Sequence, residues 1–501
     1  MTLFFVGLAI LAGGYLVYGK LVERLLGVDD RETPAVRLRD GVDYLVLPTW
    51  RDMLIQLLNI AGIGPIIGVI IGVKYGADVF LIIPVGCILG GAVHDFLAGF
   101  MSLREDGKNL PFITRKYLGP GASGVFSVML SLALLLVVAV FINVPAGLIK
   151  DGLCRWQGIE TAAAPAHLFW IPAAAIFVYY VLATLLPVNK IIGRFYPLFG
   201  IALLVGTAAL LVAALWRVFH DPSLLAESAA FRQAMFTPAN HHPIVPTLFV
   251  TIACGILSGF HATQSPIIAR TLRSELAARK TFYGMMVVEG VIAMIWAAAT
   301  LAIFNLRPEL MTLAPMPVLS ALTSDFLGTA IGSLTIFSVI ILAVTSGDTA
   351  MRCLRLSVAE ALHFPQMERY QRIAVTLPLI FLTILLLLWS NGDAASFNKL
   401  WNYFGWGNQV IASVTLLTAV VWLVAHRRNP WIAIVPGVFI TFVVVTYILW
   451  VSPAHGGPYG GGLELNLAYA IAGPLTAALF VWGWLRGRRA AMANEPDLAK
   501  N

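Results

Sequence analysis

Charged side chains are scarce in this sequence. Asp, Glu, Lys and Arg make up 12% of the 501 residues, about half of the roughly 25% found in ordinary soluble proteins. Hydrophobic residues make up 59%. Such a balance excludes a water-exposed globular fold of this size, and it predicts an all-α polytopic membrane protein surrounded by the lipid bilayer.

Cysteine is also rare. The four cysteines, Cys87, Cys154, Cys254 and Cys353, form neither a C-x-x-C pair nor a metal-ligand spacing. We therefore expect no disulfide framework, no metal site and no cofactor. The first twenty residues lack a basic n-region and an A-x-A cleavage site, so they predict a retained helix and not a cleaved signal.

Long apolar runs are what the sequence has in abundance. A helix needs about 20 predominantly apolar residues to cross a bilayer, and by that measure the sequence predicts about thirteen transmembrane helices. They cover residues 3–19, 51–74, 78–101, 121–149, 167–187, 196–216, 244–270, 281–304, 328–351, 373–389, 400–425, 431–450 and 466–485.

The distribution of positive charge supports that count. With the N-terminus outside, the cytoplasmic loops carry 26 of the 33 Lys and Arg residues and the opposite loops carry 7. Since Lys and Arg accumulate in cytoplasmic loops, this split predicts an outside N-terminus and a cytoplasmic C-terminus. The net charge of +7 then reflects membrane topology, and no nucleic-acid partner is expected.

The seventh predicted span, TIACGILSGFHATQSPIIART at residues 251–271, is interrupted at what should be mid-membrane depth. Unwound backbone survives there only where it is buried in protein or lines a wet cavity. The interrupting residues are Gly255, Gly259, His261, Gln264, Ser265 and Pro266. We expect the helix to stop near Phe260 and to restart at Ser265, an N-cap residue followed by proline. The break predicts a binding site.

The second predicted span carries a matching break at residues 59–68, NIAGIGPIIG, with Gly64 and Pro65 as its restart. It lies five spans earlier and runs in the opposite direction. Paired interrupted helices in two inverted halves indicate a secondary transporter with a central site, so the sequence predicts a 5+5 inverted repeat with discontinuous second and seventh helices. The resulting division is an extra helix (1–22), a cytoplasmic loop (23–50), the first repeat (51–217), an outside loop (218–243), the second repeat (244–425), and two C-terminal helices with a cytoplasmic tail (426–501).

Six motifs, in order, resemble those of the carbon starvation protein A family of bacterial inner-membrane transporters. They are DDRETPA with DGVDY (residues 29–35 and 40–44), IAGIGP (60–65), GAVHD (91–95), CGILSGFHA (254–262), TSGDT (345–349) and FGWGNQ (404–409). The resemblance implies a LeuT-like core, a place in the cytoplasmic membrane, and uptake of peptides during carbon starvation, or of pyruvate in close relatives. Longer members carry a His pair where this chain has Ile55 and Gln56 and often a proline where it has Val69, so the chain resembles a shorter subclass.

The two helix restarts predict where a substrate carboxylate binds. Each presents unpaired N–H groups and the positive end of a helix dipole. The residues predicted to bind substrate are Gly62, Gly64, Pro65, Asn143, Ser258, Gly259, His261, Gln264 and Ser265. The alternative is that the glycines only allow close helix packing.

The ninth span supplies candidate ion-coupling residues, namely Thr345, Ser346, Asp348 and Thr349. In the fold that the chain resembles, hydroxyls at this place and carbonyls of the first broken helix hold sodium. The carbonyls would be those of Ile60 to Gly62, since hard cations prefer oxygen ligands. Alternatively, Asp348 carries protons, or it forms an ion pair with Arg352.

Glu289 in the eighth span and Asp95, beside His94, in the third lie within apolar helices. Ionisable groups are costly there and usually face the bundle interior. Glu289 is therefore a predicted proton carrier and Asp95 a predicted ion-coupling residue, with structural polar contacts as the alternative for His94 and Asp95. The expected coupling ion is H⁺ or Na⁺.

These patterns predict a secondary active transporter that imports small peptides. A proton-coupled symporter of pyruvate or another small carboxylate is the alternative. An intramembrane enzyme using His261 with Ser258 or Ser265 is a remote alternative, because H-E-x-x-H and G-x-S-x-G motifs are lacking. A channel is also remote, because the paired broken helices disfavour it.

Overall fold

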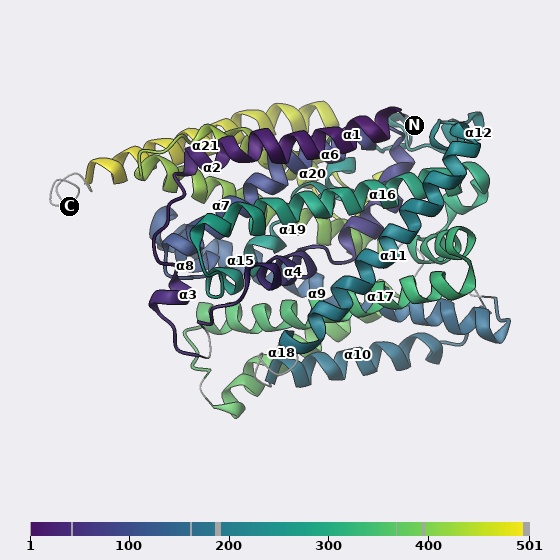
Figure 1. Ribbon diagram of the computed structural model, residues 1–501, viewed down its shortest axis with the longest axis horizontal. Coiled ribbons are helices and arrows are strands. Elements are labelled where there is room, and N and C mark those ends of the chain that lie inside the picture. The colour runs from purple at the N-terminus through teal and green to yellow at the C-terminus, as the bar shows by residue number, and fades with distance from the viewer. Residues whose placement is uncertain are drawn as a thin grey trace.

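A computed structural model describes residues 2–41, 44–160, 163–185, 192–366, 368–392 and 396–493. In this part of the chain the secondary structure is helical, apart from two isolated β-bridges that join Glu32 to Ser274 and Leu47 to Leu272. Many of the helices run along the long axis of the molecule, and α1 begins at one end whereas α21 finishes at the other (Figure 1).

The chain opens with helices outside the predicted repeats. They are α1 (Thr2–Gly13), η1 (Gly14–Tyr18), α2 (Gly19–Leu26) and α3 (Pro34–Arg37). The first predicted repeat contains α4 (Thr49–Ile60), η2 (Gly64–Gly68), α5 (Val69–Gly72), η3 (Val73–Tyr75), α6 (Val79–Gly86), η4 (Cys87–Gly91), α7 (Ala92–Arg104), α8 (Leu110–Leu118), α9 (Pro120–Gln157), α10 (His167–Leu185) and α11 (Ile192–His220).

The connection to the second half contains η7 (Pro222–Leu225), α12 (Ala229–Ala234) and η8 (Pro238–Asn240). The second predicted repeat contains η9 (Ile244–Leu248), α13 (Phe249–Thr251), α14 (Ala253–Ile256), α15 (Phe260–Ala269), η10 (Glu275–Ala277), η11 (Arg279–Tyr283), α16 (Gly284–Leu306), η12 (Pro308–Thr312), α17 (Pro315–Ala361), α18 (Arg369–Ser390) and α19 (Ser396–Ala425). The chain continues with α20 (Trp431–Trp450), η13 (Pro453–His455) and α21 (Leu465–Ala493).

Within the described residues, ten helices are long and apolar enough to cross a membrane. The segments Thr49–Ile60 and Gly64–Tyr75, bent by 51°, form an eleventh candidate, and His167–Ala183 is a shorter apolar helix. These elements, with the segmented stretch from η9 to α15, coincide with the thirteen predicted spans. The all-α membrane prediction is confirmed, and the count of thirteen stays a prediction.

The loops follow the predicted topology. α3 and α8, which lie in loops predicted to be cytoplasmic, share one end of the molecule with the end of α21 (Figure 1). α12, in a loop predicted to be outside, lies at the opposite end with the start of α1 (Figure 1). The side of the membrane that each end faces stays a prediction.

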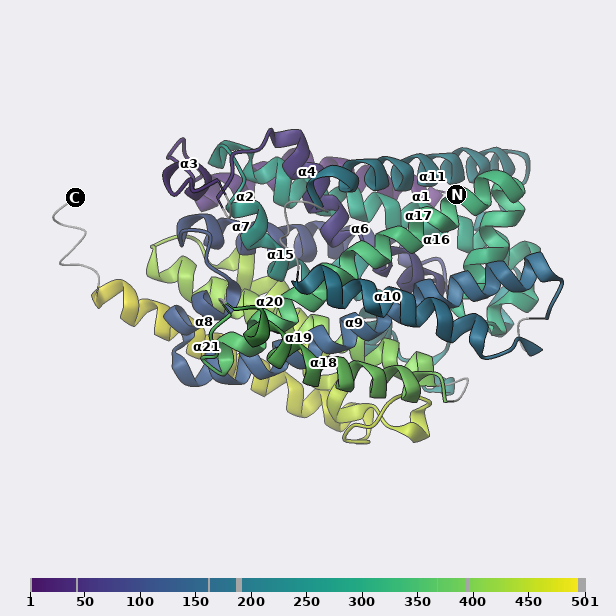
Figure 2. The same cartoon turned by 90° about the horizontal axis from the view of Figure 1, so that it is seen from below.

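The bundle is built around α9, α17 and α19. α9 packs against both of the others, α11 packs on α17, α15 packs on α7, and α20 and α21 pack on α19. Figure 2 shows α4 and α11 along one side of the molecule and α18 and α21 along the opposite side. The broken helices therefore have protein on several sides, as unwound backbone at membrane depth requires.

The first broken helix restarts where the sequence predicts. α4 ends at Ile60, and the helix resumes at Gly64 with Pro65 in its first turn. Proline suits this position because its missing N–H would have no intrahelical partner there.

The second broken helix is interrupted earlier in the sequence than predicted. α14 ends at Ile256, Leu257 is extended, and α15 already begins at Phe260. The predicted restart at Ser265 is therefore wrong, because Ser265 and the proline after it lie inside α15.

A distant helix determines where that break lies. The Gly259 N–H donates to the carbonyl of Asn408 on α19 at 3.0 Å, so the backbone of the break is paired outside its own helix. A side chain at Gly259 would place Cβ 2.4 Å from that carbonyl oxygen and from Ala412 N. This close approach needs glycine, whereas Pro266 costs α15 only one internal hydrogen bond.

Candidate functional site

Four titratable side chains from three helices meet in the interior, and we call them the His–Asp–Glu cluster. They are His94 and Asp95 on α7, His261 on α15 and Glu289 on α16. Each is at most 1% exposed. Hydrogen bonds join Asp95 Oδ1 to His94 Nδ1 at 2.9 Å and Asp95 Oδ2 to His261 Nδ1 at 3.0 Å. The second ring nitrogen of His261, Nε2, lies 3.7 Å from Glu289 Oε2.

The early break gives His261 its place in this cluster. Because α15 begins at Phe260, His261 lies in its first turn, beside α7. Neither carboxylate oxygen of Glu289 has a hydrogen-bond partner in the part of the chain that the structure describes. A charged carboxylate without such partners is expensive in a dry interior, so the pair of His261 and Glu289 can hold or release a proton depending on its surroundings.

The seryl side chains are arranged differently from those of a hydrolase. The Ser265 hydroxyl donates to the backbone carbonyl of His261 at 3.4 Å. Both ring nitrogens of His261 face carboxylates, and in the described residues neither Ser258 nor Ser265 is hydrogen-bonded to that ring. The geometry of an activated serine nucleophile is not formed here.

The structure brings part of the predicted sodium site together. The Ser346 hydroxyl on α17 donates to the carbonyl of Leu58, near the end of α4, at 3.3 Å. Gly62 lies against the same hydroxyl, because an added Cβ there would be 3.8 Å from Ser346 Oγ. Thr345 and Thr349 instead donate to carbonyls of their own helix. Ion binding by this group stays a prediction.

Asp348 and Arg352 both turn to α10. Asp348 Oδ2 accepts a hydrogen bond from the Tyr179 hydroxyl at 2.7 Å, and Arg352 Nη2 donates to the Ala183 carbonyl at 2.7 Å. Asp348 Oδ1 is buried and has no hydrogen-bond partner within the described ranges. The carboxyl group thus has one satisfied oxygen and one free one.

The predicted substrate residues are tightly packed. A Cβ at Gly64 would lie 2.2 Å from the Cβ of Cys254, so the two broken helices touch at this glycine. The Asn143 side chain donates to Ser390 on α18 at 2.9 Å. Close packing is therefore observed, and substrate binding by the predicted set stays a prediction.

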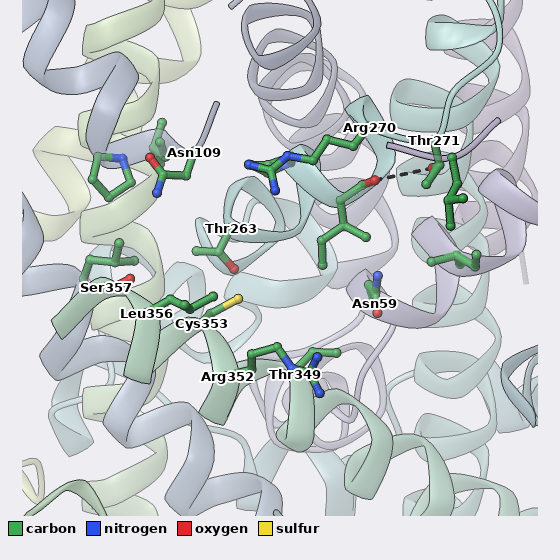
Figure 3. Close-up of a pocket in the computed structure, with 17 residues that line it drawn as sticks. Asn59, Asn109, Thr263, Arg270, Thr271, Thr349, Arg352, Cys353, Leu356 and Ser357 are labelled. Carbon is green, nitrogen blue, oxygen red and sulfur yellow. Dashed lines mark hydrogen bonds between the residues drawn. The ribbon is translucent and has the colours of Figure 1, made fainter. Parts of the chain in front are cut away.

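A cavity of about 300 Å³ lies between α4, α8, α15 and α17 (Figure 3). Its polar lining includes Asn59, Asn109, Thr263, Arg270, Thr349 and Arg352. Thr349 is the one residue of the predicted sites among its lining residues. Asn59 directly precedes the first break, and Thr263 follows the second. A polar residue beside each break is the sequence signal that could have located this cavity.

A network of charged groups lies at the predicted cytoplasmic end. Arg104 donates to both oxygens of Glu275, at 2.5 and 2.8 Å, and the Asp29 N–H donates to Glu275 Oε1 at 3.1 Å. The hydrogen bond from Arg31 lowers the pKa of Asp29 to about 2. Nearby, the Leu45 N–H donates to the Arg270 carbonyl at 3.1 Å. The loop before α4 is thereby held beside Arg270.

A helical bundle with two interrupted helices, one of them beside a buried titratable cluster, is the architecture of a membrane transporter. Solved structures agree on the fold. The chain is similar to a manganese transporter from Eremococcus coleocola (TM-score 0.55, 13% identity, 90% of this chain and 99% of that chain) and to MhsT in complex with L-phenylalanine (TM-score 0.55, 14% identity, 89% and 100%). This likeness shows a LeuT-like fold.

The family follows from sequence. The chain belongs to the carbon starvation protein CstA family, whose model matches residues 1–168, 166–319 and 312–447. It is 39% identical over 344 residues to an uncharacterized membrane protein of Haemophilus influenzae, covering 61% of this chain and 92% of that protein. It is 28% identical over 351 residues to the peptide transporter CstA of Bacillus subtilis, covering 60% of this chain and 58% of that protein.

A further relative is the peptide transporter CstA of Helicobacter pylori strain J99, with 29% identity over 335 residues, 56% of this chain and 48% of that protein. The chain thus spans about half the length of these peptide transporters. The predicted family and LeuT-like fold are confirmed.

Proposed function

We propose that this protein is a secondary active transporter that imports small peptides across the bacterial cytoplasmic membrane and is driven by protons. The observation that carries the proposal is the His–Asp–Glu cluster beside the second helix break. Relatives named as peptide transporters support the substrate class.

Proton coupling is supported by how the cluster is built. A proton on His261 is stabilised by Asp95 at 3.0 Å and has a second acceptor, Glu289, at 3.7 Å. The cluster joins α7 of the first predicted repeat to α15 and α16 of the second. A relative movement of the repeats would change these distances, and with them the affinity for the proton, which is what coupling by alternating access requires.

Sodium is the alternative coupling ion. It is favoured by the contact between Ser346 and the end of α4, where hydroxyl and carbonyl oxygens approach each other. Those are the ligand types that sodium takes as a hard cation.

Pyruvate or another small carboxylate is the alternative substrate. The cavity of about 300 Å³ is at the lower end of the range of roughly 300–1,000 Å³ for small-molecule sites. Its arginines would suit any substrate with a carboxylate.

The test is uptake into proteoliposomes in sodium-free buffer with an imposed inward proton gradient. Labelled L-alanyl-L-alanine and labelled pyruvate are supplied separately. We expect the dipeptide to accumulate and the accumulation to vanish when an ionophore dissipates the gradient. Accumulation of pyruvate alone would favour the alternative substrate, and accumulation that needs sodium and ignores the proton gradient would refute proton coupling.

A further inference from the structure

The cavity between α4, α15 and α17 contains two arginines on opposite walls (Figure 3). Arg270 follows α15, and Arg352 lies on α17. Arg270 Nε donates to the Gly107 carbonyl at 2.9 Å, and Arg352 Nη2 donates to the Ala183 carbonyl at 2.7 Å. Both side chains are thus positioned by neutral backbone groups, and among the described residues neither forms an ion pair with a carboxylate.

Two polar atoms at the cavity lack partners. Arg352 Nε and Asn59 Oδ1 are buried and make no hydrogen bond to any described residue. Asn59 as a whole is 2% exposed. A buried polar atom without a partner is costly, so these atoms are expected to be paired when the site is filled. Arg352 offers an N–H donor and Asn59 an acceptor.

The cavity opens at its rim. Ile267 and Leu356 line it and are 37% and 45% exposed. Arg270 and Asn109, at the same end, lie in or beside loops that the positive charge assigns to the cytoplasm. The cavity is therefore accessible from the inner side in the conformation described here.

We propose that this cavity is the inward-facing substrate site and that Arg352 and Arg270 bind the carboxylate of the transported substrate. This inference rests on the proposed function and specifies its substrate chemistry. Guanidinium groups form charge-assisted, often bidentate hydrogen bonds with carboxylates. Asn59 accepts an N–H from the rest of a peptide, and its amide can be turned to donate to a keto oxygen. The shared recognition element is the carboxylate, in the peptide C-terminus or in a 2-keto acid.

Cys353 provides a direct reporter for occupancy. It lines the cavity, whereas Cys87, Cys154 and Cys254 are buried. The full chain in nanodiscs is treated with a maleimide in the presence of L-alanyl-L-alanine, pyruvate, or the uncharged amide of each. We expect an acid at ten times its Kd to slow labelling about tenfold, by occupancy, and its amide to have no effect. Cys353→Ser should abolish the labelling and so identify the site.

The arginine is tested by Arg352→Gln, Arg352→Lys and a matched control, Arg355→Gln. Arg355 lies on the same helix, bonds to Gln366 and does not line the cavity. We expect Arg352→Gln to raise the KM for uptake by about tenfold or more, because a charge-assisted bond is lost, and to abolish protection of Cys353. Arg352→Lys should restore part of both, and Arg355→Gln should leave both unchanged.

The outcomes separate this inference from the function on which it rests. Uptake of either acid by the wild type, with no protection of Cys353 and a normal KM in Arg352→Gln, would overturn the site alone. Equal protection by acids and amides would overturn carboxylate recognition. No uptake of either acid would refute the proposed function and this inference with it. Protection by one acid only would support the site and identify the source of the carboxylate.

Discussion

Glu289 is the least satisfied member of the His–Asp–Glu cluster, since neither of its carboxylate oxygens has a hydrogen-bond partner among the described residues. Its nearest cation candidate is His261, at 3.7 Å. Such a group is retained at a cost in stability, so the proposed role of Glu289 in proton coupling can be tested by removing its charge.

Glu289→Gln keeps the shape of the side chain and removes its proton. We expect proton-driven accumulation to fall by about tenfold or more, the equivalent of ~1.4 kcal/mol of lost coupling. Exchange of labelled for unlabelled substrate at zero gradient should persist, because it needs no net proton movement. Glu309→Gln, at a residue whose side chain is 64% exposed, is the matched control. Accumulation at the wild-type level in Glu289→Gln would show that another group carries the proton.

Individual residues of the cluster could be predicted from sequence, but their arrangement could not. Glu289, Asp95 and His261 each stood out as a polar group in an apolar helix. Their contact depends on three helices, and Asp95 and His261 are 166 residues apart. The two cavity arginines resemble ordinary loop and interface charges in sequence, because only the fold shows that neither forms a salt bridge with a carboxylate of the described residues.

Between helices, the closest contacts at the second break are made by backbone atoms. Gly259 approaches the carbonyl of Asn408 and the amide of Ala412, whereas an added Cβ at Gly255 would meet its nearest neighbour, the Cβ of Ala293, at 3.4 Å. We expect Gly259→Ala to destabilise the protein by at least the roughly 1–3 kcal/mol typical of overpacking, since backbone cannot swing away. Gly255→Ala should be nearly neutral.

The measurement is thermal unfolding of the two purified variants, together with their uptake rates. The two glycines lie in the same broken helix, so glycine propensity alone would give them similar effects. Equal melting temperatures would contradict the close contact with α19.

The position of the second break could not be predicted from local sequence rules. Proline and an N-cap serine favoured a restart at Ser265, but a hydrogen bond to a helix 149 residues further along the chain holds the break at Gly259. The first break was located correctly because Gly64 and Pro65 determine it locally.

For the whole molecule, binding of the coupling ion should raise the stability of the folded state. A ligand that binds only the folded protein stabilises it by about 2.7 kcal/mol at a hundred times its Kd. We expect replacing choline by sodium at constant ionic strength to leave the melting temperature unchanged. A rise with sodium that disappears in Ser346→Ala would instead support the sodium site.

Which stretches form apolar helices could be predicted from hydropathy, since length and composition determine which helices can span a bilayer, whereas the number of spans stays a prediction. The start of α1 and the end of α21 lie at opposite ends of the bundle (Figure 1), as the predicted odd number of spans would place them. Packing of α20 and α21 on α19 has no signature in the sequence, because it depends on how the side chains of two different helices fit together.

Because of its hydrogen bond to Asn408, the backbone amide of Gly259 also reports on conformational exchange. That N–H is paired with α19 and not with its own helix, so it can meet solvent only when α15 and α19 separate. Its deuterium exchange rate therefore counts opening events of this contact, and a substrate that traps one conformation would slow that rate without touching the glycine itself.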